Sequence, residues 1–374
     1  MKTPQFPTEY TQIVDRMRTF DPTKSYQSTR NNIDGDVSYL SPYITHGVLP
    51  LRNVFSYYFT EYELYDAYKY LQELTWREFF QRVWWNHGDD IFTDLRREQP
   101  QVKRTGVPEA LDNAETGIDA IDSQLTALKS NGYVHNHARM WIAAIACNIG
   151  QFHWWEPSKW FYYHLLDGDP ASNMINWQWV AGSASYNKYW FNQDNVNKFA
   201  TALQNDTWID TSYDAIKQLD ITIPDNVTST AELNLNTDLP STQKPQLDPS
   251  KPLYLYHNFH LDPEWRQGVD ANRVFVLEPD HFKRFPVSEN VMDFILDLAD
   301  NIDGLEIFVG EPADLSTDRF PAVRTKAHQA YTHWPGKKDK RDIIFRSVDD
   351  NDVGLVFTPY WKDHCYPRLK ELSA

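Results

Sequence analysis

Apolar residues recur three and four positions apart from about Pro7 to Thr211, the spacing that places them on one face of a helix. Gly and Pro interrupt this pattern, and runs that alternate apolar with polar residues, as half-buried strands do, are few. The periodicity therefore predicts one all-helical domain over residues 1–215.

The pattern changes after Lys251. Short apolar runs that predict buried strands lie at 253–259, 274–278 and 305–310. Helical spacing predicts helices over Glu289–Asn301 and Ala322–His333. Strands that alternate with helices are typical of a parallel α/β layer, which we expect over residues 251–374. Residues 216–250 are rich in Pro, Thr, Asn, Asp and Ser, and this composition predicts a solvated linker between the two domains.

Composition excludes several classes of protein. No stretch approaches the ~20 apolar residues of a membrane-spanning helix, and the first ten residues lack the basic start and apolar run of a signal peptide. We therefore expect a cytoplasmic protein with no membrane partner. Cys147 and Cys365 are the only cysteines, too few for a disulfide framework, a four-thiolate zinc site or an iron–sulfur cluster, so no metal is expected.

The net charge of −16 argues against a surface that binds nucleic acid throughout, because such binding needs clustered Lys and Arg. Any DNA site must be local. Aromatic residues make up 15% of the chain, with 14 Trp that concentrate between Trp76 and Trp190. Such residues build a core, stack on a flavin or a base, or relay electrons, and composition alone does not separate these roles.

The segment from Val37 to Pro42 is the first with candidate chemistry. Ser38 and Ser41 supply hydroxyls, and the free backbone N–H groups ahead of a helix start favour a bound phosphate. Pro42 occupies a position where its missing N–H does no harm. An ordinary helix N-cap without a ligand fits the same residues.

A second segment places Glu73, Trp76, Arg77 and Phe80 on one helix face. Such a face presents a carboxylate, an indole, a guanidinium and a phenyl ring together. It fits a structural ion pair among core aromatics, and it fits a ligand site equally well, because Glu and Arg on an aromatic stripe need partners or a cavity.

A third segment, 132–141, runs into the apolar stretch 142–147. Asn136, Arg139 and Met140 share the face that continues into this stretch, so Arg139 enters the interior and needs a buried anion. His135 and His137 fit structural roles better than catalytic ones, because no Ser or Cys nucleophile pattern is nearby.

A fourth segment begins a helix at Asp169, with Pro170 at the first helical position and Gly182 as its stop. Asn173 and Trp177 lie one and two turns further on, along the same side as the cap. A neutral amide and an indole aligned behind the carboxylates of Asp167 and Asp169 are uncommon in pure packing.

Together, in this order, the four segments resemble the FAD-binding domain of DNA photolyases and cryptochromes from about Tyr26 to Phe199. The resemblance implies a U-shaped FAD held in a helical bundle. The phosphates and ribityl chain would contact Tyr26, Arg30, Ser38, Leu40 and Ser41, with Arg77 nearby. The isoalloxazine would be surrounded by Asn136, Arg139, Asp167, Asp169 and Asn173.

Two of these positions have a specific implied role. Arg139 and Asp167 would be the family's ion pair beside the flavin, and Asp167 would then supply the anion that Arg139 requires. Asn173 would face flavin N5, where a neutral amide accepts a hydrogen bond from N5–H without adding an ionisable group.

The resemblance also implies a substrate site and an electron path. Positions that would contact a flipped-out cyclobutane pyrimidine dimer are Glu73, Trp76, Asn136, Met140 and Trp179. Met140 favours this lesion, because six-four photolyases carry His there. Trp177 and Trp154 would be the inner and middle members of an electron-transfer chain. Candidates for its outer member are Trp84, Trp85, Trp155 or a Tyr. His137 and the loop 180–188 depart from the family's pattern.

The C-terminal α/β part resembles pieces of the family's Rossmann-like antenna domain, placed after the FAD-binding domain instead of before it. The function implied is a blue-light-driven lyase that repairs damaged DNA with reduced FAD. An alternative is a cryptochrome-like photoreceptor that acts on a signalling partner without repair, and a third is an FAD protein that works in the dark. The basic residues 96–104, which include Arg96 and Arg97, would favour DNA if they lie beside the cavity, although such a run is more often a solvated face.

Overall fold

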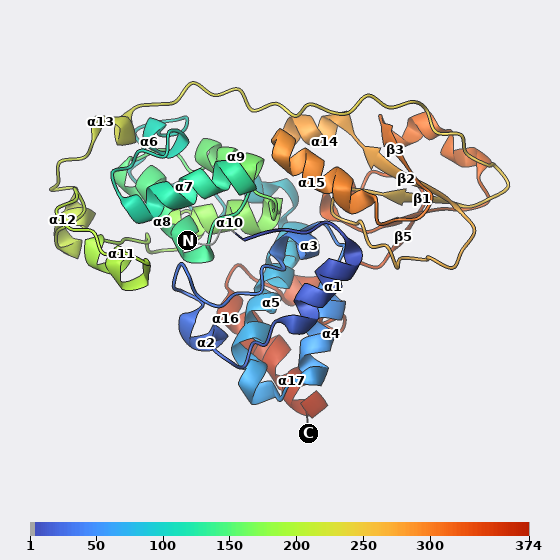
Figure 1. The fold of residues 1–374 in the computed structure, drawn as a ribbon, viewed down its shortest axis with the longest axis horizontal. Helices are drawn as coiled ribbons and strands as arrows, with labels where there is room; N and C mark the ends of the chain where they lie inside the picture. Colours follow the sequence, from blue (N-terminus) through green and yellow to red (C-terminus); the bar gives the residue numbers. More distant parts are fainter. Residues whose placement is uncertain (1–3, 374) are drawn as a thin grey trace.

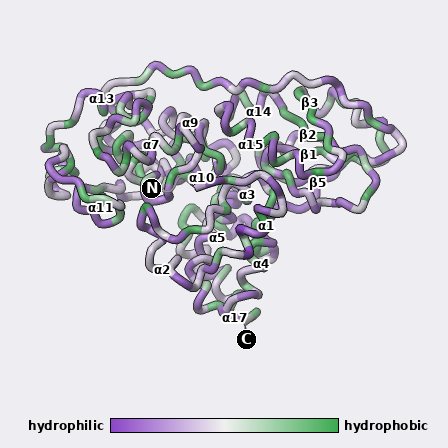
Figure 2. The backbone as a smooth tube through the Cα atoms, viewed as in Figure 1, coloured by the Kyte–Doolittle hydropathy of each residue, from purple (hydrophilic) through white to green (hydrophobic). Residues whose placement is uncertain are grey.

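The computed structural model describes residues 4–373, which form a helical part, a small parallel sheet and a C-terminal segment that runs back to the helical part (Figure 1). The helical part contains α1 (Tyr10–Thr19), α2 (Tyr26–Thr29), α3 (Ser41–Thr45), α4 (Leu51–Glu61), α5 (Leu64–His87), α6 (Glu109–Asp112), α7 (Asp119–Asn131), α8 (Asn136–Ala144), α9 (Trp155–His164), α10 (Pro170–Ala181), α11 (Gln193–Phe199), α12 (Tyr213–Gln218) and α13 (Asp225–Thr228). Figure 2 shows apolar and polar stretches alternating along these helices, as expected where one face of each is buried. The helical prediction is confirmed.

Helix α10 begins and ends where the sequence predicts. The Asp169 side chain accepts a hydrogen bond from the Ser172 backbone N–H at 2.7 Å, and Pro170 is the first helical residue. Gly182 follows the last residue with φ of +83°, a left-handed conformation that glycine adopts at little cost. The start of α10 is therefore rigid, and it holds the side chains that follow it in fixed directions.

The sheet has the order β3-β2-β1-β4-β5, and all of its neighbouring strands are parallel. Its strands are β1 (Leu253–Tyr256), β2 (Asn272–Leu277), β3 (Leu305–Val309), β4 (Val323–Lys326) and β5 (Lys337–Asp339), with helices α14 (Pro279–Arg284) and α15 (Glu289–Ala299). Three strands and the helix at 289 are as predicted. The expected helix over Ala322–His333 is wrong: that segment forms β4 and a short 3₁₀ turn, because β4 pairs with both β1 and β5 and gains hydrogen bonds on each side.

Residues 231–248 form neither helix nor strand and run along the top of the molecule in Figure 1, between α13 and the sheet. This segment is nevertheless attached. Thr237 exchanges hydrogen bonds with the backbone of Val287 at 3.0 and 2.7 Å, and Thr242 accepts one from the backbone N–H of Val309 at 2.8 Å. Within the described part of the chain, no helix is long and apolar enough to cross a membrane.

The C-terminal segment, residues 341–373, packs against α5, and it carries α16 (Phe357–Pro359), a π-helical stretch (Tyr360–Cys365) and α17 (Tyr366–Ser373). Glu78 and Arg82 on α5 fasten it, and neither side chain is exposed to solvent. Arg82 pairs with Glu78 at 2.8 Å and donates to the Phe345 carbonyl at 2.7 Å. Glu78 in turn accepts from the Tyr360 hydroxyl at 2.9 Å. Within residues 251–374, which the sequence predicts as one α/β domain, these contacts join the C-terminal segment to α5.

Replacing Arg82 by Met should destabilise the protein by about 3–5 kcal/mol, because it leaves the Glu78 carboxylate buried without its charged partner. Urea unfolding followed by circular dichroism would measure the change. Arg284→Met is the matched control: Arg284 pairs with Asp89 at the surface, where side chains are 48% and 72% exposed, and its loss should cost less than about 1 kcal/mol. Equal losses in the two variants would contradict the assignment.

Candidate functional site

An ion pair between α8 and the loop before α10 lies at the centre of the site. One Arg139 nitrogen reaches both Asp167 oxygens, at 2.9 and 2.8 Å, and the Arg139 Nε donates to the Val134 carbonyl at 2.9 Å. The Asp167 side chain is only 5% exposed. Burial alone would raise the pKa of Asp167, but the guanidinium of Arg139 and a hydrogen bond from Ser41 hold it below the usual value. Asp167 is thus the buried anion that the sequence predicted for Arg139.

Arg77 on α5 brings a second cation to the same place. It donates to the Thr45 hydroxyl at 2.6 Å and lies close enough to Asp167 and Asp169 for both carboxylates to favour its charged form. Burial lowers the pKa of Arg77, yet a guanidinium stays protonated in a protein. Asp169 also accepts a hydrogen bond from Gln81, and burial raises the pKa of Asp169. Two arginines and two aspartates therefore converge from three separate segments.

The loop from Ser38 to Ser41 has an unusual backbone. Tyr39 has φ of +53°, in the left-handed region, and Leu40 follows with φ of −90° and ψ of −8°. Successive left-handed and right-handed residues are common in anion-binding turns. Here the Leu40 N–H also donates to the Ser38 hydroxyl at 3.4 Å. Residues held in such strained conformations cluster at functional sites.

Asn173 lies one turn into α10 and is nearly buried. Its amide nitrogen donates to the Ser158 carbonyl at 2.8 Å, which fixes the orientation of the side chain. Among the described residues, none donates a hydrogen bond to its oxygen. The arrangement thus leaves one neutral acceptor for a ligand.

Of the tryptophans proposed as an electron path, Trp177 and Trp154 are buried and Trp155 is half-buried. Trp177 meets Phe161 edge-on with ring centroids 5.7 Å apart, and Trp154 donates to Asp94 at 2.7 Å. Trp155 packs edge-on against Trp154, with centroids 5.6 Å apart. Trp84 contacts Phe92 instead. Trp155 is therefore the tryptophan in contact with the middle member of the series.

The residues expected to contact a lesion are not brought together by any contact among the described residues. Trp76 stacks on Phe357 of the C-terminal segment, with centroids 3.7 Å apart and planes 13° apart. Glu73 pairs with Lys69 at 2.8 Å and with Arg30 at 3.7 Å. Trp179 is 46% exposed.

The remaining predicted residues have varied surroundings. Asn136 is exposed and Met140 half-buried. Tyr26 packs edge-on against Phe20 and Tyr70 in an aromatic cluster, and burial raises the pKa of Tyr26. Leu40 is buried at the start of α3.

Two basic residues lie beside the loop that follows Trp179. Arg97 donates to the carbonyls of Gly182 and Tyr186, each at 2.7 Å, and the Arg96 guanidinium lies 5.7 Å from the Tyr186 ring. The run at 96–97 is therefore a structural support of this loop as well as a source of positive charge.

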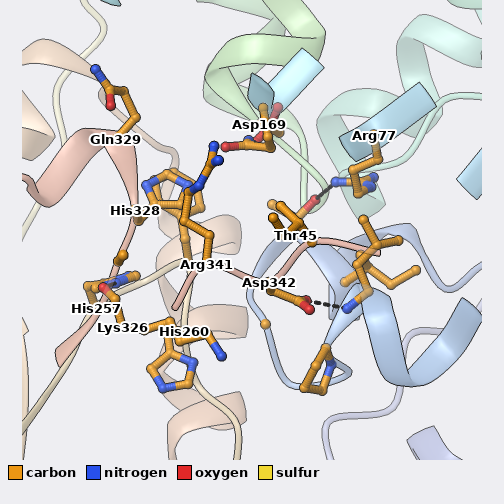
Figure 3. A pocket seen from close by; sticks show the side chains of 18 residues that line it. Thr45, Arg77, Asp169, His257, His260, Lys326, His328, Gln329, Arg341 and Asp342 are labelled. Carbon is orange, nitrogen blue, oxygen red and sulfur yellow. Dashed lines mark hydrogen bonds between the residues drawn. The ribbon is translucent and has the colours of Figure 1, made fainter. Parts of the chain in front are cut away.

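Sequence reasoning missed a set of polar residues from the C-terminal half of the chain that share a cavity with Arg77 and Asp169 (Figure 3). These residues are His257, His260, Lys326, His328, Gln329, Arg341 and Asp342. Most of them follow strands β1 and β4, and the ends of parallel strands where the strand order reverses are a frequent place for ligands. The predicted strands could have pointed to them only if the strand order had been known.

Residues 70–218 match the family model described as the FAD binding domain of DNA photolyase. This segment is therefore similar to the FAD-binding domain of photolyases and cryptochromes. It is 29% identical over 167 residues to a deoxyribodipyrimidine photo-lyase of Streptomyces griseus, covering 44% of this chain and 36% of that protein. It is 31% identical over 171 residues to a cryptochrome DASH of Ostreococcus tauri, covering 43% and 31%.

A crystal structure of a Synechocystis cryptochrome is 25% identical, with a TM-score of 0.49, and the similarity covers 53% of this chain and 44% of that one. The curated photo-lyase and cryptochrome DASH are covered over 36% and 31% of their lengths, so the chain spans about a third of each.

FAD is the cofactor of this domain family, and the site has features that fit it. The loop at Tyr39 combines a left-handed residue with the hydroxyls of Ser38 and Ser41, a composition suited to a pyrophosphate. The Arg139–Asp167 pair and the free oxygen of Asn173 offer donors and an acceptor suited to the polar edge of a flavin ring.

Changing Asp167 to Asn should reduce the flavin that copurifies with the protein by about tenfold or more, because Arg139 loses its charged partner at the centre of the site. The ratio of flavin to protein absorbance would measure this, with circular dichroism to verify folding. Asp280→Asn, which alters an exposed pair with Lys283, is the control and should keep its flavin. Normal flavin content in the Asp167 variant would show that the pair does not support the cofactor.

Proposed function

We propose that the protein binds FAD in its helical part and uses blue light to split cyclobutane pyrimidine dimers in DNA. The observation that carries this proposal is the buried Arg139–Asp167 pair beside the rigid start of α10, within the segment that matches the FAD-binding domain. Bound FAD supplies the light-absorbing electron donor. All other tasks fall to the side chains of this chain.

For the cofactor, the proposed roles follow the geometry of the site. The N–H groups of the Ser38–Ser41 loop hold the pyrophosphate, and Arg77 balances its charge. Asp167 fixes Arg139 in one orientation. The amide oxygen of Asn173 accepts a hydrogen bond from an N–H of the flavin ring, and the amide itself does not ionise. The proposed cofactor site also includes Tyr26, Arg30, Leu40, Asn136 and Asp169.

For the substrate, the exposed indole of Trp179 provides a stacking surface for an extruded base. Arg96 and Arg97 lie at the neighbouring loop and attract DNA phosphates locally, which a chain of net charge −16 cannot do over its whole surface. A damaged base pair costs less to extrude than an intact one. The proposed lesion contacts are Glu73, Trp76, Asn136, Met140 and Trp179, and damaged DNA is the proposed partner.

A second function is supported by one specific observation. Phe357 covers a face of the Trp76 ring, and Glu73 is already paired with Lys69 and Arg30. Both features leave less room for a lesion on this side of α5. They favour a photoreceptor in which light changes the contact between α5 and the C-terminal segment, and a signalling partner senses the change.

The deciding experiment is a repair assay on the flavin-loaded protein, with a thymine-dimer oligonucleotide, in the dark and under blue light. We expect repair only in the light. Trp179→Ala should weaken binding of the lesion by about tenfold, since stacking on an aromatic side chain contributes about 1–3 kcal/mol per base. Tyr65→Ala, which removes another exposed aromatic residue, is the control. A flavin that is reduced by light while the dimer stays intact would favour the photoreceptor.

The electron path makes a separate prediction. Trp155→Phe should slow the light-driven reduction of bound flavin severalfold, because Trp155 is the tryptophan packed against Trp154. The rate is measured from flavin absorbance under steady blue light with an external reductant. Trp190→Phe is the control and should keep the normal rate. If Trp155→Phe also keeps the normal rate, the electrons leave by another residue.

A further inference from the structure

A cavity of about 70 Å³ lies where the helical part meets the α/β part. On one side, it is lined by residues at the carboxyl ends of β1 and β4, among them His257 and Lys326. On the other side lie Thr45, Arg77 and Asp169, and Arg341 reaches in from the C-terminal segment (Figure 3). In the order β3-β2-β1-β4-β5, the strand sequence reverses between β1 and β4, and ligands of open parallel sheets bind at this point.

Three nitrogen atoms of the lining residues are buried and have no hydrogen-bond partner: His257 Nδ1, His260 Nε2 and Arg341 Nη1. His257 and His260 are 0% and 3% exposed. A buried polar atom without a partner costs free energy, so such atoms are rare unless a ligand or water satisfies them. Three of them around one cavity indicate a polar ligand.

The hydrogen-bonding roles of these atoms restrict the ligand. His257 Nε2 lies 3.2 Å from the Lys326 carbonyl and must donate to it, and burial lowers the pKa of His257 to about 3. In the neutral ring, Nδ1 is therefore an acceptor. Arg341 Nη1 and the Lys326 ammonium are obligate donors. The ligand must offer several acceptor oxygens and at least one O–H.

The donors around the cavity favour a ligand with acceptor oxygens. Lys326 and Arg341 line it together with the carboxylates of Asp169 and Asp342. Arg341 pairs with Asp350 through Nη2, which leaves its Nη1 without a partner. Both lining carboxylates already accept hydrogen bonds from backbone N–H groups. Asp169 accepts one from Ser172 at 2.7 Å, and Asp342 accepts one from Arg52 at 3.2 Å. They therefore compete weakly for the remaining donors.

Metal binding does not explain the histidines, because no group of three or more His, Cys, Asp or Glu within residues 4–373 is placed to hold a metal ion. The volume corresponds to a few water molecules, so it suits a small group and not a dinucleotide.

We propose that this cavity binds hydrogen phosphate, either free or as the singly protonated terminal group of a small phosphate ester. Lys326 and Arg341 donate to its oxygens, its P–OH donates to His257 Nδ1, and His260 Nε2 lies at the same cavity. A phosphate held in this way joins the ends of β1 and β4 to the C-terminal segment. This proposal does not depend on light-driven repair.

Isothermal titration of the flavin-loaded, full-length protein with inorganic phosphate at pH 7 tests the proposal, with sodium chloride keeping the ionic strength constant. We expect saturable binding of phosphate, and weaker binding of sulfate, which has no O–H at this pH to offer His257. Flavin absorbance must stay constant, so that phosphate is not entering the pyrophosphate site. Absence of saturable binding, or equal affinity for the two anions, would overturn the proposal.

Lys326→Met should weaken phosphate binding by about tenfold, because it removes a charged donor from the cavity. Lys337→Met, which removes an exposed lysine from the neighbouring strand β5, should bind phosphate as the wild type does. An equal effect of both variants would show a general charge effect and contradict the site. A nucleoside 5′-monophosphate distinguishes the two sources: tighter binding than inorganic phosphate identifies an ester, and weaker binding identifies the free anion.

Discussion

The buried pair of Glu78 and Arg82 is the interaction on which the rest of the structure depends. Two ionised groups with no exposure to solvent are tolerated only when every donor and acceptor is satisfied, and here the backbone and hydroxyl groups of the C-terminal segment satisfy them. One residue before Glu78, Arg77 faces the opposite set of partners, Thr45 and the two aspartates. One turn of α5 therefore fixes the C-terminal segment and the candidate site together.

The candidate site follows the same logic of charge compensation. Asp167 forms an ion pair with Arg139. Asp169 caps α10 and also lies close to the positive charge of Arg77. The orientation of Asn173 is fixed by its hydrogen bond to a backbone carbonyl. These interactions hold the charged side chains in place before a flavin enters. The residues assigned to a lesion differ from this, because Trp76 and Glu73 are held by neighbours from other segments.

The sequence predicted the features that local rules control. The Asp169 cap, the Gly182 stop and the partnership of Arg139 with Asp167 all follow from spacing, from the need to neutralise a buried charge, or from the resemblance. The segment after Ala322 was predicted wrongly, because strand pairing on both sides outweighed its helical spacing. The return of residues 341–373 to α5 could not be predicted, since no local pattern marks the partner of a distant buried ion pair. The cavity near Lys326 could not be predicted either, because its position depends on the strand order.

The attachment of the C-terminal segment also sets the order in which the molecule can be completed. A chain made from its N-terminus produces α5 early, while Phe345 and Tyr360, which satisfy Glu78 and Arg82, are made after all five strands of the sheet. Until then the central helix carries two ions without their full set of partners. The core around α5 therefore closes only after the sheet has been synthesised.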